Sequence, residues 1–284
     1  MRRKILLPTD FSKNSWHAIN YALELYKNDN CDFYILNVFS ATSNILDSLM
    51  NMEPGSELYE TAKAKSEDGL AKVLDKLAVN GYDENKHHFH AISQFNNVIE
   101  AIKNVVDEKD IEIIVMGTKG ETGARETVFG STAIYVMEKV RNCPVIVVPE
   151  HAKKQLPKEI VFPTGYKTFF KRRELKYLIE IAEKCNATIA ILHISNENKL
   201  DVSQLKNKQL LEEMFEEVKY SFHNLSNYSI ETAVNIFTES RDSDMVAFIN
   251  RKHPFFGSIL TKPLVKEIGF QSKVPILVMH DLRN

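Results

Sequence analysis

The segment KILLPTDFSKNS, from Lys4 to Ser15, has a counterpart later in the chain in EIVFPTGYKTFF, from Glu159 to Phe170. In both segments a short apolar run ends in Pro-Thr. Two further pairs follow in the same order, FYILNVFS at Phe33 to Ser40 with TIAILHIS at Thr188 to Ser195, and NCPVIVVPE at Asn142 to Glu150 with KVPILVMHD at Lys273 to Asp281. This repeated order of similar segments indicates a tandem duplication.

The length of the chain agrees with a duplication. Its 284 residues exceed an ordinary single domain and suit two domains, each large enough to bury a core of its own. The polar segment PEHAKKQLPK, Pro149 to Lys158, is bracketed by prolines and makes a suitable boundary. The sequence therefore predicts a first domain at 1–150, a linker at 151–158 and a second domain at 159–284.

Short apolar runs alternate with helical patterns in the first copy. Strands are predicted at Ile5 to Leu7, Phe33 to Phe39, Phe89 to Ile92, Ile111 to Met116 and Val145 to Val148. Helices are predicted from the N-cap Ser12 onward and at about Glu57 to Ala78, Asn96 to Lys109 and Ser131 to Val140. Strands that are apolar nearly throughout are typical of parallel sheets covered on both faces. The expected fold class is α/β, with two tandem open parallel five-stranded sheets flanked by helices.

A glycine-rich loop follows the fourth predicted strand and leads into the next helix. Gly117, Gly120 and Gly130, with Ser131 and Thr132 directly after, form the pattern G-x2-G-x9-G-[ST]. Glycines can adopt positive φ angles and let backbone N–H groups approach an anion, and a helix N-terminus adds unpaired donors and a positive dipole end. Because ligands of open α/β sheets bind at the carboxyl ends of the strands, the loop is predicted to hold a polyphosphate.

Charge and chemistry around this loop favour binding over hydrolysis. Lys119 and Arg125 lie in the loop and can neutralise phosphate charge. A structural interpretation stays open, in which the glycines only form turns and Ser131 only caps the helix. The loop is not a Walker motif, because no lysine directly follows its last glycine, and its serine has no assigned histidine base.

The loop pattern, its place between a strand and a helix, and PTDFS at Pro8 to Ser12 together resemble the universal stress protein family. The adenine-nucleotide-binding members of that family carry this G-x2-G-x9-G-[ST] loop. The resemblance covers essentially the whole chain, which is similar to a tandem member with two such domains. It implies Rossmann-like sheets of the adenine nucleotide alpha hydrolase type with strand order 3-2-1-4-5. It also implies ATP as the ligand, alone or with Mg²⁺.

Carried over position by position, the resemblance implies a nucleotide site in the first domain. Asp10 corresponds to the acidic residue that meets the ribose, and a carboxylate can accept both ribose hydroxyls. The structural alternative for Asp10 is an Asx turn that leads into the Ser12 cap. Val38 corresponds to the position whose backbone recognises adenine. The implied nucleotide-binding residues are Pro8, Thr9, Asp10, Val38, Met116, Gly117, Lys119, Gly120, Gly130, Ser131 and Thr132, with no catalytic residue and no metal ligand.

Composition and charge narrow the function classes. The formal net charge is -2 without a long run of one sign, so neither nucleic acid nor a membrane is an expected partner. The apolar run at the start is too short for a signal peptide and no later stretch could span a bilayer, so a cytoplasmic location is expected. Three scattered cysteines are predicted to be reduced and mostly buried.

Histidines offer two further candidate positions. His87, His88 and His90 cluster in KHHFHAI, where a solvated edge strand is favoured over a metal site because a metal needs more ligands. His193, in ILHIS, is predicted to be a satisfied core or interface histidine.

The two copies are not expected to be equivalent. Gly165 occupies the position of Asp10, and the turn after the strand Met245 to Phe248 lacks the glycines of the first copy. If VNIF, Val234 to Phe237, is the third strand of the second copy, about seven residues remain before the next strand, too few for a parallel crossover. ATP binding is therefore expected in the first domain alone.

Three functions are weighed for the chain. The favoured one is a cytoplasmic ATP-binding module that acts in stress response and regulation, because phosphate donors are present and no clear base is. The alternatives are a slow ATP hydrolase or self-phosphorylating enzyme, with Ser131 or Thr132 as acceptor, and a flavin-binding relative of electron-transfer flavoproteins. Pairing of the two domains through their last strands, CPVIVVP and VPILVM, is expected within the chain, since it would cover two sheet edges. A homodimer of chains also stays open.

Overall fold

The computed structural model describes residues 2–39, 53–118, 130–153, 155–195, 199–250 and 272–280. The first half, up to residue 153, contains β1 (Arg3–Pro8), α1 (Lys13–Leu25), β2 (Cys31–Phe39), α2 (Glu57–Val79), β3 (His87–Phe95), α3 (Val98–Lys109), β4 (Ile113–Gly117), α4 (Ser131–Lys139) and β5 (Val145–Val148). The second half, from residue 155, contains β6 (Glu159–Thr164), α5 (Arg172–Cys185), β7 (Thr188–Ile194), α6 (Val202–Met214), β8 (Lys219–Leu225), α7 (Ile230–Arg241), β9 (Met245–Asn250) and β10 (Ile276–His280).

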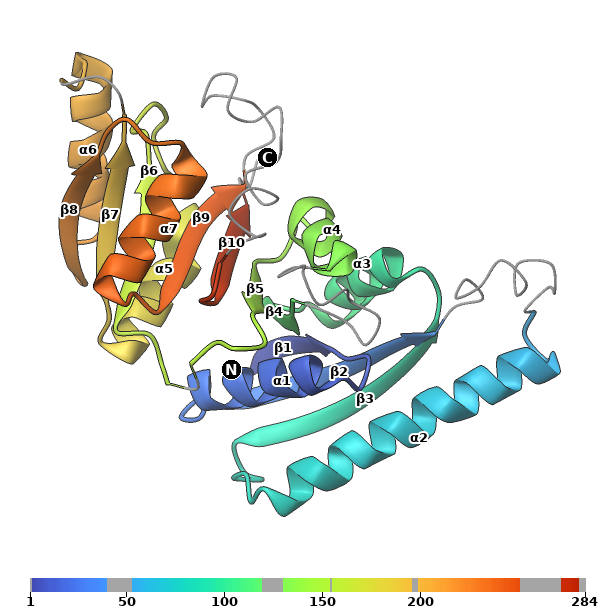
Figure 1. The fold of residues 1–284 in the computed structure, drawn as a ribbon. Coiled ribbons are helices and arrows are strands. Elements are labelled where there is room, and N and C mark those ends of the chain that lie inside the picture. Colours follow the sequence, from blue (N-terminus) through green and yellow to red (C-terminus); the bar gives the residue numbers. More distant parts are fainter. Residues whose placement is uncertain are drawn as a thin grey trace.

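All of these strands belong to one sheet. Its order is β3-β2-β1-β4-β5-β10-β9-β6-β7-β8, so each half has the predicted order 3-2-1-4-5. Strands within a half are parallel, whereas β5 and β10 pair antiparallel with Ile146 opposite Leu277. Figure 1 shows this pair at the centre, with β3 and β8 far from it. The two predicted five-stranded sets are thus continuous with each other in a ten-stranded sheet.

Apolar side chains cover both faces of the sheet. Neighbouring residues of a strand point to opposite faces, so Ile5 belongs to the cluster that includes buried residues of α1, α2, α5 and α6, while Leu6 belongs to the cluster with α3, α4 and α7. Each of these two cores runs through both halves. Burial on both faces explains why the strands read as nearly continuous apolar runs in the sequence.

Helix starts agree with the capping signals in the sequence. The Ser12 hydroxyl accepts a hydrogen bond from the Ser15 amide at 3.1 Å and caps α1. Ser56 and Asn97 cap α2 and α3 in the same way. Each cap satisfies an amide that the helix itself leaves unpaired.

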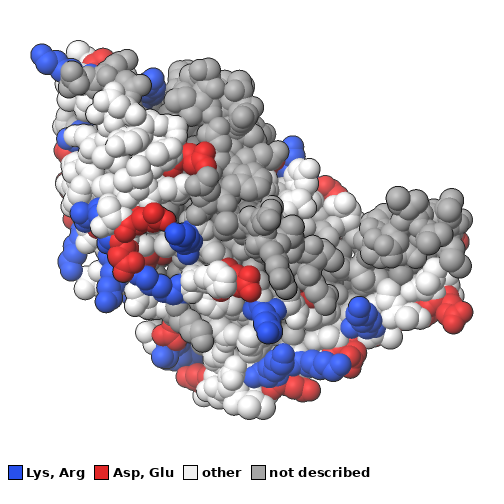
Figure 2. Space-filling model, viewed as in Figure 1, with Lys and Arg blue, Asp and Glu red and all other residues white. Residues whose placement is uncertain are grey.

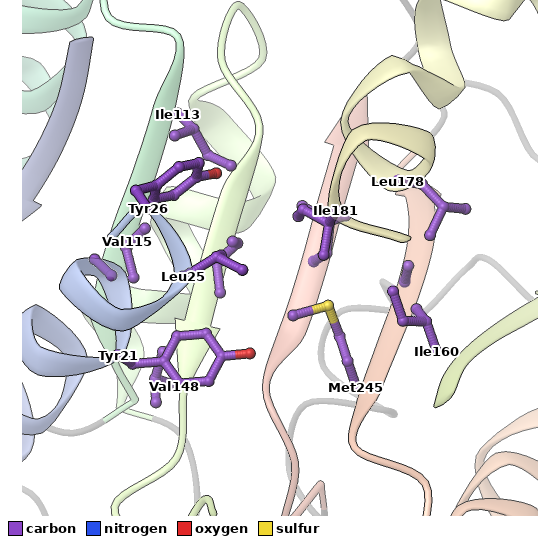
Figure 3. Close-up of a cluster of buried hydrophobic side chains, with 14 of the residues drawn as sticks. Tyr21, Leu25, Tyr26, Ile113, Val115, Val148, Ile160, Leu178, Ile181 and Met245 are labelled. Atoms are coloured by element: carbon purple, nitrogen blue, oxygen red, sulfur yellow. The ribbon is translucent and has the colours of Figure 1, made fainter. Parts of the chain in front are cut away.

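The junction between the halves is an apolar core. Figure 3 shows Tyr21 and Leu25 of α1 with Val148 of β5 on one side, and Ile181 of α5 with Met245 of β9 on the other. These five side chains are buried in one cluster. Burial of large side chains contributes most of the stability at such a contact.

Charged pairs border this junction. Arg3 lies 3.1 Å from the Glu180 carboxylate, and Lys184 pairs with Asp29 while its ammonium stands 4.2 Å from the ring centroid of Tyr26. Partly exposed ion pairs add little free energy on their own. They orient the two halves around the apolar contact.

The third strand of the second half corrects the sequence interpretation. Val234 to Phe237 lies within α7, and the third strand is β8, which pairs parallel with β7. The crossover from β8 to β9 therefore contains a complete helix and is not shortened. The sequence misled because Ala233, Val234 and Phe237 are the buried face of a helix, whereas β8 is an edge strand in which polar and apolar residues mix.

Surface charge on the molecule is mixed. On the face in Figure 2, Lys and Arg side chains lie between Asp and Glu side chains. None of the helices in the described ranges combines the length and the apolar character needed to cross a bilayer.

Leu277→Ala tests whether the two halves unfold together. Leu277 is fully buried in β10, and its truncation should lower the free energy of unfolding by about 2–5 kcal/mol. Trp16, the single tryptophan, belongs to α1 of the first half, so its fluorescence in a urea titration should report this loss. Leu205→Ala, at a position 54% exposed, should change stability by less than about 0.5 kcal/mol. A Trp16 transition that stays in place in Leu277→Ala would show independent unfolding.

Candidate functional site

The turn between β1 and α1 carries Asp10. Phe11 adopts a φ of 68°, and its amide donates a hydrogen bond to the Thr9 hydroxyl at 3.0 Å. The Asp10 carboxylate accepts a hydrogen bond from the Ser12 amide at 3.2 Å, which is the Asx turn considered from the sequence. A carboxylate has about four acceptor positions. The Asx turn uses one of these positions.

Beside this turn, β2 extends beyond the end of β1. The last hydrogen bond of their ladder runs from the Thr9 amide to the Leu36 carbonyl at 2.8 Å. The Thr9 carbonyl accepts from the Asn37 side-chain amide at 2.7 Å. Because peptide groups two residues apart on a strand face the same neighbour, Val38 turns its N–H and C=O toward the place where β1 has ended. A backbone N–H and C=O that are not used in the sheet ladder are what the recognition of a planar ring edge requires.

Gly117 lies at the end of β4, where α1 passes close to it. A Cβ on Gly117 would stand 2.9 Å from Nδ2 of Asn14 and 3.1 Å from its carbonyl carbon. Asn14 is buried and donates to the Thr118 hydroxyl at 3.2 Å. Gly117 is not among the glycines with positive φ in the described residues. The glycine therefore serves close packing against α1, and the expected positive φ is wrong at this position.

The N-terminus of α4 has no side-chain cap. Gly130 is the N-cap with a φ of -74°, and its amide donates to the Thr118 carbonyl. Ser131 and Thr132 follow as helical residues with exposed side chains. The interpretation of Ser131 as the capping residue is thus wrong, because Ser131 lies one position inside the helix. Within the described residues, no side chain therefore caps the first amides of α4.

These residues meet at one edge of the sheet. Neighbouring strands β1 and β4 continue to β2 and β5 on opposite sides, so their carboxyl ends form a topological switch point. Pro8, Thr9, Asp10, Val38, Met116, Gly117, Gly130, Ser131 and Thr132 lie at or next to the ends of β1, β2 and β4 or at the start of α4. Lys119, Gly120 and Arg125 lie outside the described residues.

The second half repeats the backbone of the turn without its carboxylate. Tyr166 has a φ of 55°, and its amide donates to the Thr164 hydroxyl at 3.1 Å, as in the first copy. Gly165 stands in place of Asp10. By strand register Ile249 replaces Gly117, and Asn250 after it donates to the Met137 carbonyl of α4. The end of β9 is therefore hydrogen-bonded to α4 of the first half.

Two buried polar side chains of the second half, Gln204 and Asn207, escaped the sequence interpretation, and both act beside the predicted His193. The three side chains bind consecutive carbonyls of the turn between β6 and α5: His193 Nδ1 to Thr164 O at 3.0 Å, Gln204 Nε2 to Gly165 O at 2.9 Å and Asn207 Nδ2 to Tyr166 O at 2.7 Å. Polar residues on the inner face of a helix are the signal that could have revealed Gln204 and Asn207. His193 is buried as predicted, but among the described residues only its Nδ1 has a hydrogen-bond partner.

Cysteines and edge histidines have ordinary structural roles. Burial raises the pKa of Cys31 to about 12 and that of Cys185 to about 11, so these thiols stay protonated at neutral pH. On the edge strand β3, His88 Nδ1 lies 3.2 Å from the Asp32 carboxylate. Among the described residues, no three His, Cys, Asp or Glu side chains gather in a way that could hold a metal ion.

Gly117→Ala separates packing from ligand binding. We expect the free energy of unfolding to fall by about 1–3 kcal/mol, because the added Cβ overlaps Asn14. Ser131→Ala, at an exposed position of the same edge, should stay within about 0.5 kcal/mol of the parent. Thermal unfolding of both variants measures the difference. Equal stability of Gly117→Ala and the parent would mean that the glycine is not required for packing.

Comparisons with known proteins agree with this geometry. The profile of the Universal stress protein family matches residues 1–149. A universal stress protein of Methanocaldococcus jannaschii is 28% identical over 153 residues, which are 54% of this chain and 85% of that protein. A universal stress protein of Bacillus subtilis is 27% identical over 150 residues, 52% of this chain and 99% of that one.

The fold extends over the second half as well. The crystal structure of a universal stress protein from Archaeoglobus fulgidus covers 97% of both chains with a TM-score of 0.70 and 18% identity. That likeness shows a shared fold over nearly the whole length. Since the family profile itself matches more than half of the residues, this chain belongs to the universal stress protein family.

Proposed function

We propose that residues 1–150 form a domain that binds ATP, and that the chain acts as a nucleotide-dependent regulatory module in the response to stress. Residues 159–284 form the second domain, which takes no ATP. The observation that carries the proposal is the uncapped N-terminus of α4 at the switch point between β1 and β4. Helix N-termini of this kind bind phosphate through amides and the helix dipole.

The order of the sheet edge fits the order of the parts of ATP. Strand β1 lies between β2 and β4, so the Asp10 turn stands between the Val38 peptide and the start of α4. In this arrangement Val38 would bind the adenine edge, Asp10 the ribose hydroxyls, and the amides at Gly130 to Thr132 the phosphates. Met116, 6% exposed, would contribute an apolar wall. Lys119 and Gly120 belong to the same proposed site, and Mg²⁺ would reach it with the phosphates.

Binding rather than dedicated catalysis fits the chemistry of this edge. Ser131 and Thr132 expose hydroxyls at the start of α4, where they would donate to phosphate oxygens. A hydrolase would also need a residue that orients water. Single-turnover incubation with radiolabelled ATP distinguishes the two, and we expect labelled ATP to be recovered intact.

Ser131→Asp separates ligand binding from folding. A carboxylate in the first turn of a helix interacts favourably with the positive end of the helix dipole and stabilises the helix. The same carboxylate repels a triphosphate bound at that place. We expect ATP affinity to fall at least about tenfold (~1.4 kcal/mol), with an unchanged or higher melting temperature. Calorimetry on the full chain should give one ATP per chain for the parent.

Ser131→Asn is the matched control, because asparagine has nearly the same shape as aspartate and carries no charge. It should bind ATP nearly as the parent does. If Ser131→Asp bound ATP undiminished, the start of α4 would not be part of the site.

Asp10→Asn tests the ribose contact. Asparagine can form the same Asx turn to the Ser12 amide, so the α1 start is retained while the acceptor charge is lost. We expect weaker binding of ATP by about tenfold (~1–2 kcal/mol) and unchanged binding of adenine, which has no ribose. Calorimetry with both ligands measures the contrast. Equal losses for ATP and adenine would point to a folding effect and argue against the contact.

A further inference from the structure

The second half contains a cavity of about 250 Å³ between α6 and the ends of β7 and β8. His193, Ser195, Lys199, Lys208 and Asn224 contribute to its wall. It lies on the sheet face covered by α5 and α6, opposite the face covered by α3, α4 and α7. The cavity is therefore separate from the proposed ATP site.

A change from aromatic to small residues opens this cavity. In the first half Phe39 and Phe95 end β2 and β3 with ring centroids 5.6 Å apart, and Tyr59 of α2 packs on both. Continuing the registers of β7 and β8 by one residue places Ser195 and Ser226 at the same positions. Two small hydroxyl side chains thus stand where two rings fill the first half.

His193 lines this space and carries a hydrogen-bond acceptor that is not used within the described residues. Its Nδ1 binds the Thr164 carbonyl, which can only accept, so Nδ1 carries the hydrogen and Nε2 of the neutral ring is an acceptor. Nε2 is buried and has no hydrogen-bond partner among the described residues, and His193 is only 6% exposed. Asn37 makes the equivalent bond to the Thr9 carbonyl in the first half. A histidine is therefore not needed for that bond, and its second nitrogen is left for a ligand donor.

The charge of the wall is positive. Lys208 and Lys199 are lining residues, and the described lining residues include no carboxylate. The Lys208 ammonium stands 4.2 Å from the ring centroid of Phe222 and 3.9 Å from the carboxylate of Glu212, one helical turn along α6. Lys199 is exposed on the segment before α6. Two ammonium groups beside a set of hydroxyl and amide groups suit an anion that also carries hydroxyls.

We propose that the second half binds a small phosphate monoester with hydroxyl groups, such as a sugar or polyol phosphate. Lys199 and Lys208 bind the phosphate, and a ligand hydroxyl donates to Nε2 of His193. Asn224 and Ser226 bind further hydroxyls. The volume of about 250 Å³ lies below the roughly 300–1,000 Å³ of sites for larger ligands, so the cavity suits a molecule smaller than ATP.

Calorimetry on the full chain with ribose phosphate, glycerol phosphate and inorganic phosphate tests the proposal. We expect at least one of the two esters to bind more tightly than inorganic phosphate, and saturating ATP to leave that binding unchanged. Lys199→Ala should weaken both the ester and inorganic phosphate by about tenfold. Lys176→Ala, an exposed lysine of α5 with a side chain 55% exposed, is the control and should bind as the parent does.

His193→Asn is the most specific variant, because it can keep the bond to the Thr164 carbonyl as Asn37 does to Thr9. It should weaken the ester about tenfold and leave inorganic phosphate unchanged. In the parent, the nitrogen-15 resonance of His193 Nε2 should shift when the ester is added. Absence of ester binding at millimolar concentration, unchanged ester affinity in Lys199→Ala, or an Nε2 resonance that does not move would each overturn the proposal.

Discussion

The antiparallel pairing of β5 with β10 is the interaction on which the rest of this structure depends. Each half ends its sheet on one of these strands, and either strand alone would present unpaired backbone groups and an apolar edge. Their pairing makes one ten-stranded sheet and lets both cores continue from one half into the other. Tyr21 and Leu25 of α1 are buried because α5 and β9 stand across that pair.

The two halves keep one backbone and differ in the side chains that complete it. Phe11 and Tyr166 both have positive φ, and each donates its amide to the threonine two residues earlier. Around this shared turn, Asn37 is exchanged for His193 and the Phe39 pair for serines. Rings therefore pack together at the ends of β2 and β3, whereas a polar cavity lies at the ends of β7 and β8. The two halves therefore share a backbone turn and differ in the polar groups around it.

The glycine-rich motif combines two physical requirements that its sequence pattern does not separate. Gly117 lacks a side chain because Asn14 of α1 occupies that space. Gly130 is the N-cap of α4, and no side chain of the described residues caps that helix. One glycine therefore serves packing and the other serves the proposed phosphate contact. The structural and functional interpretations of the motif apply to different residues.

The sequence by itself determined the strand-helix alternation and the Ser12 cap, because these follow from local periodicity and capping chemistry, while the order 3-2-1-4-5 was implied by the resemblance to the universal stress protein family. The sequence placed the third strand of the second half wrongly, since an edge strand has little apolar signal of its own. Only the tertiary structure decided that Gly117 packs on α1 and that Nε2 of His193 is buried without a partner among the described residues. Both depend on contacts between segments far apart in the chain, and local patterns carry no record of which distant side chain fills a given space.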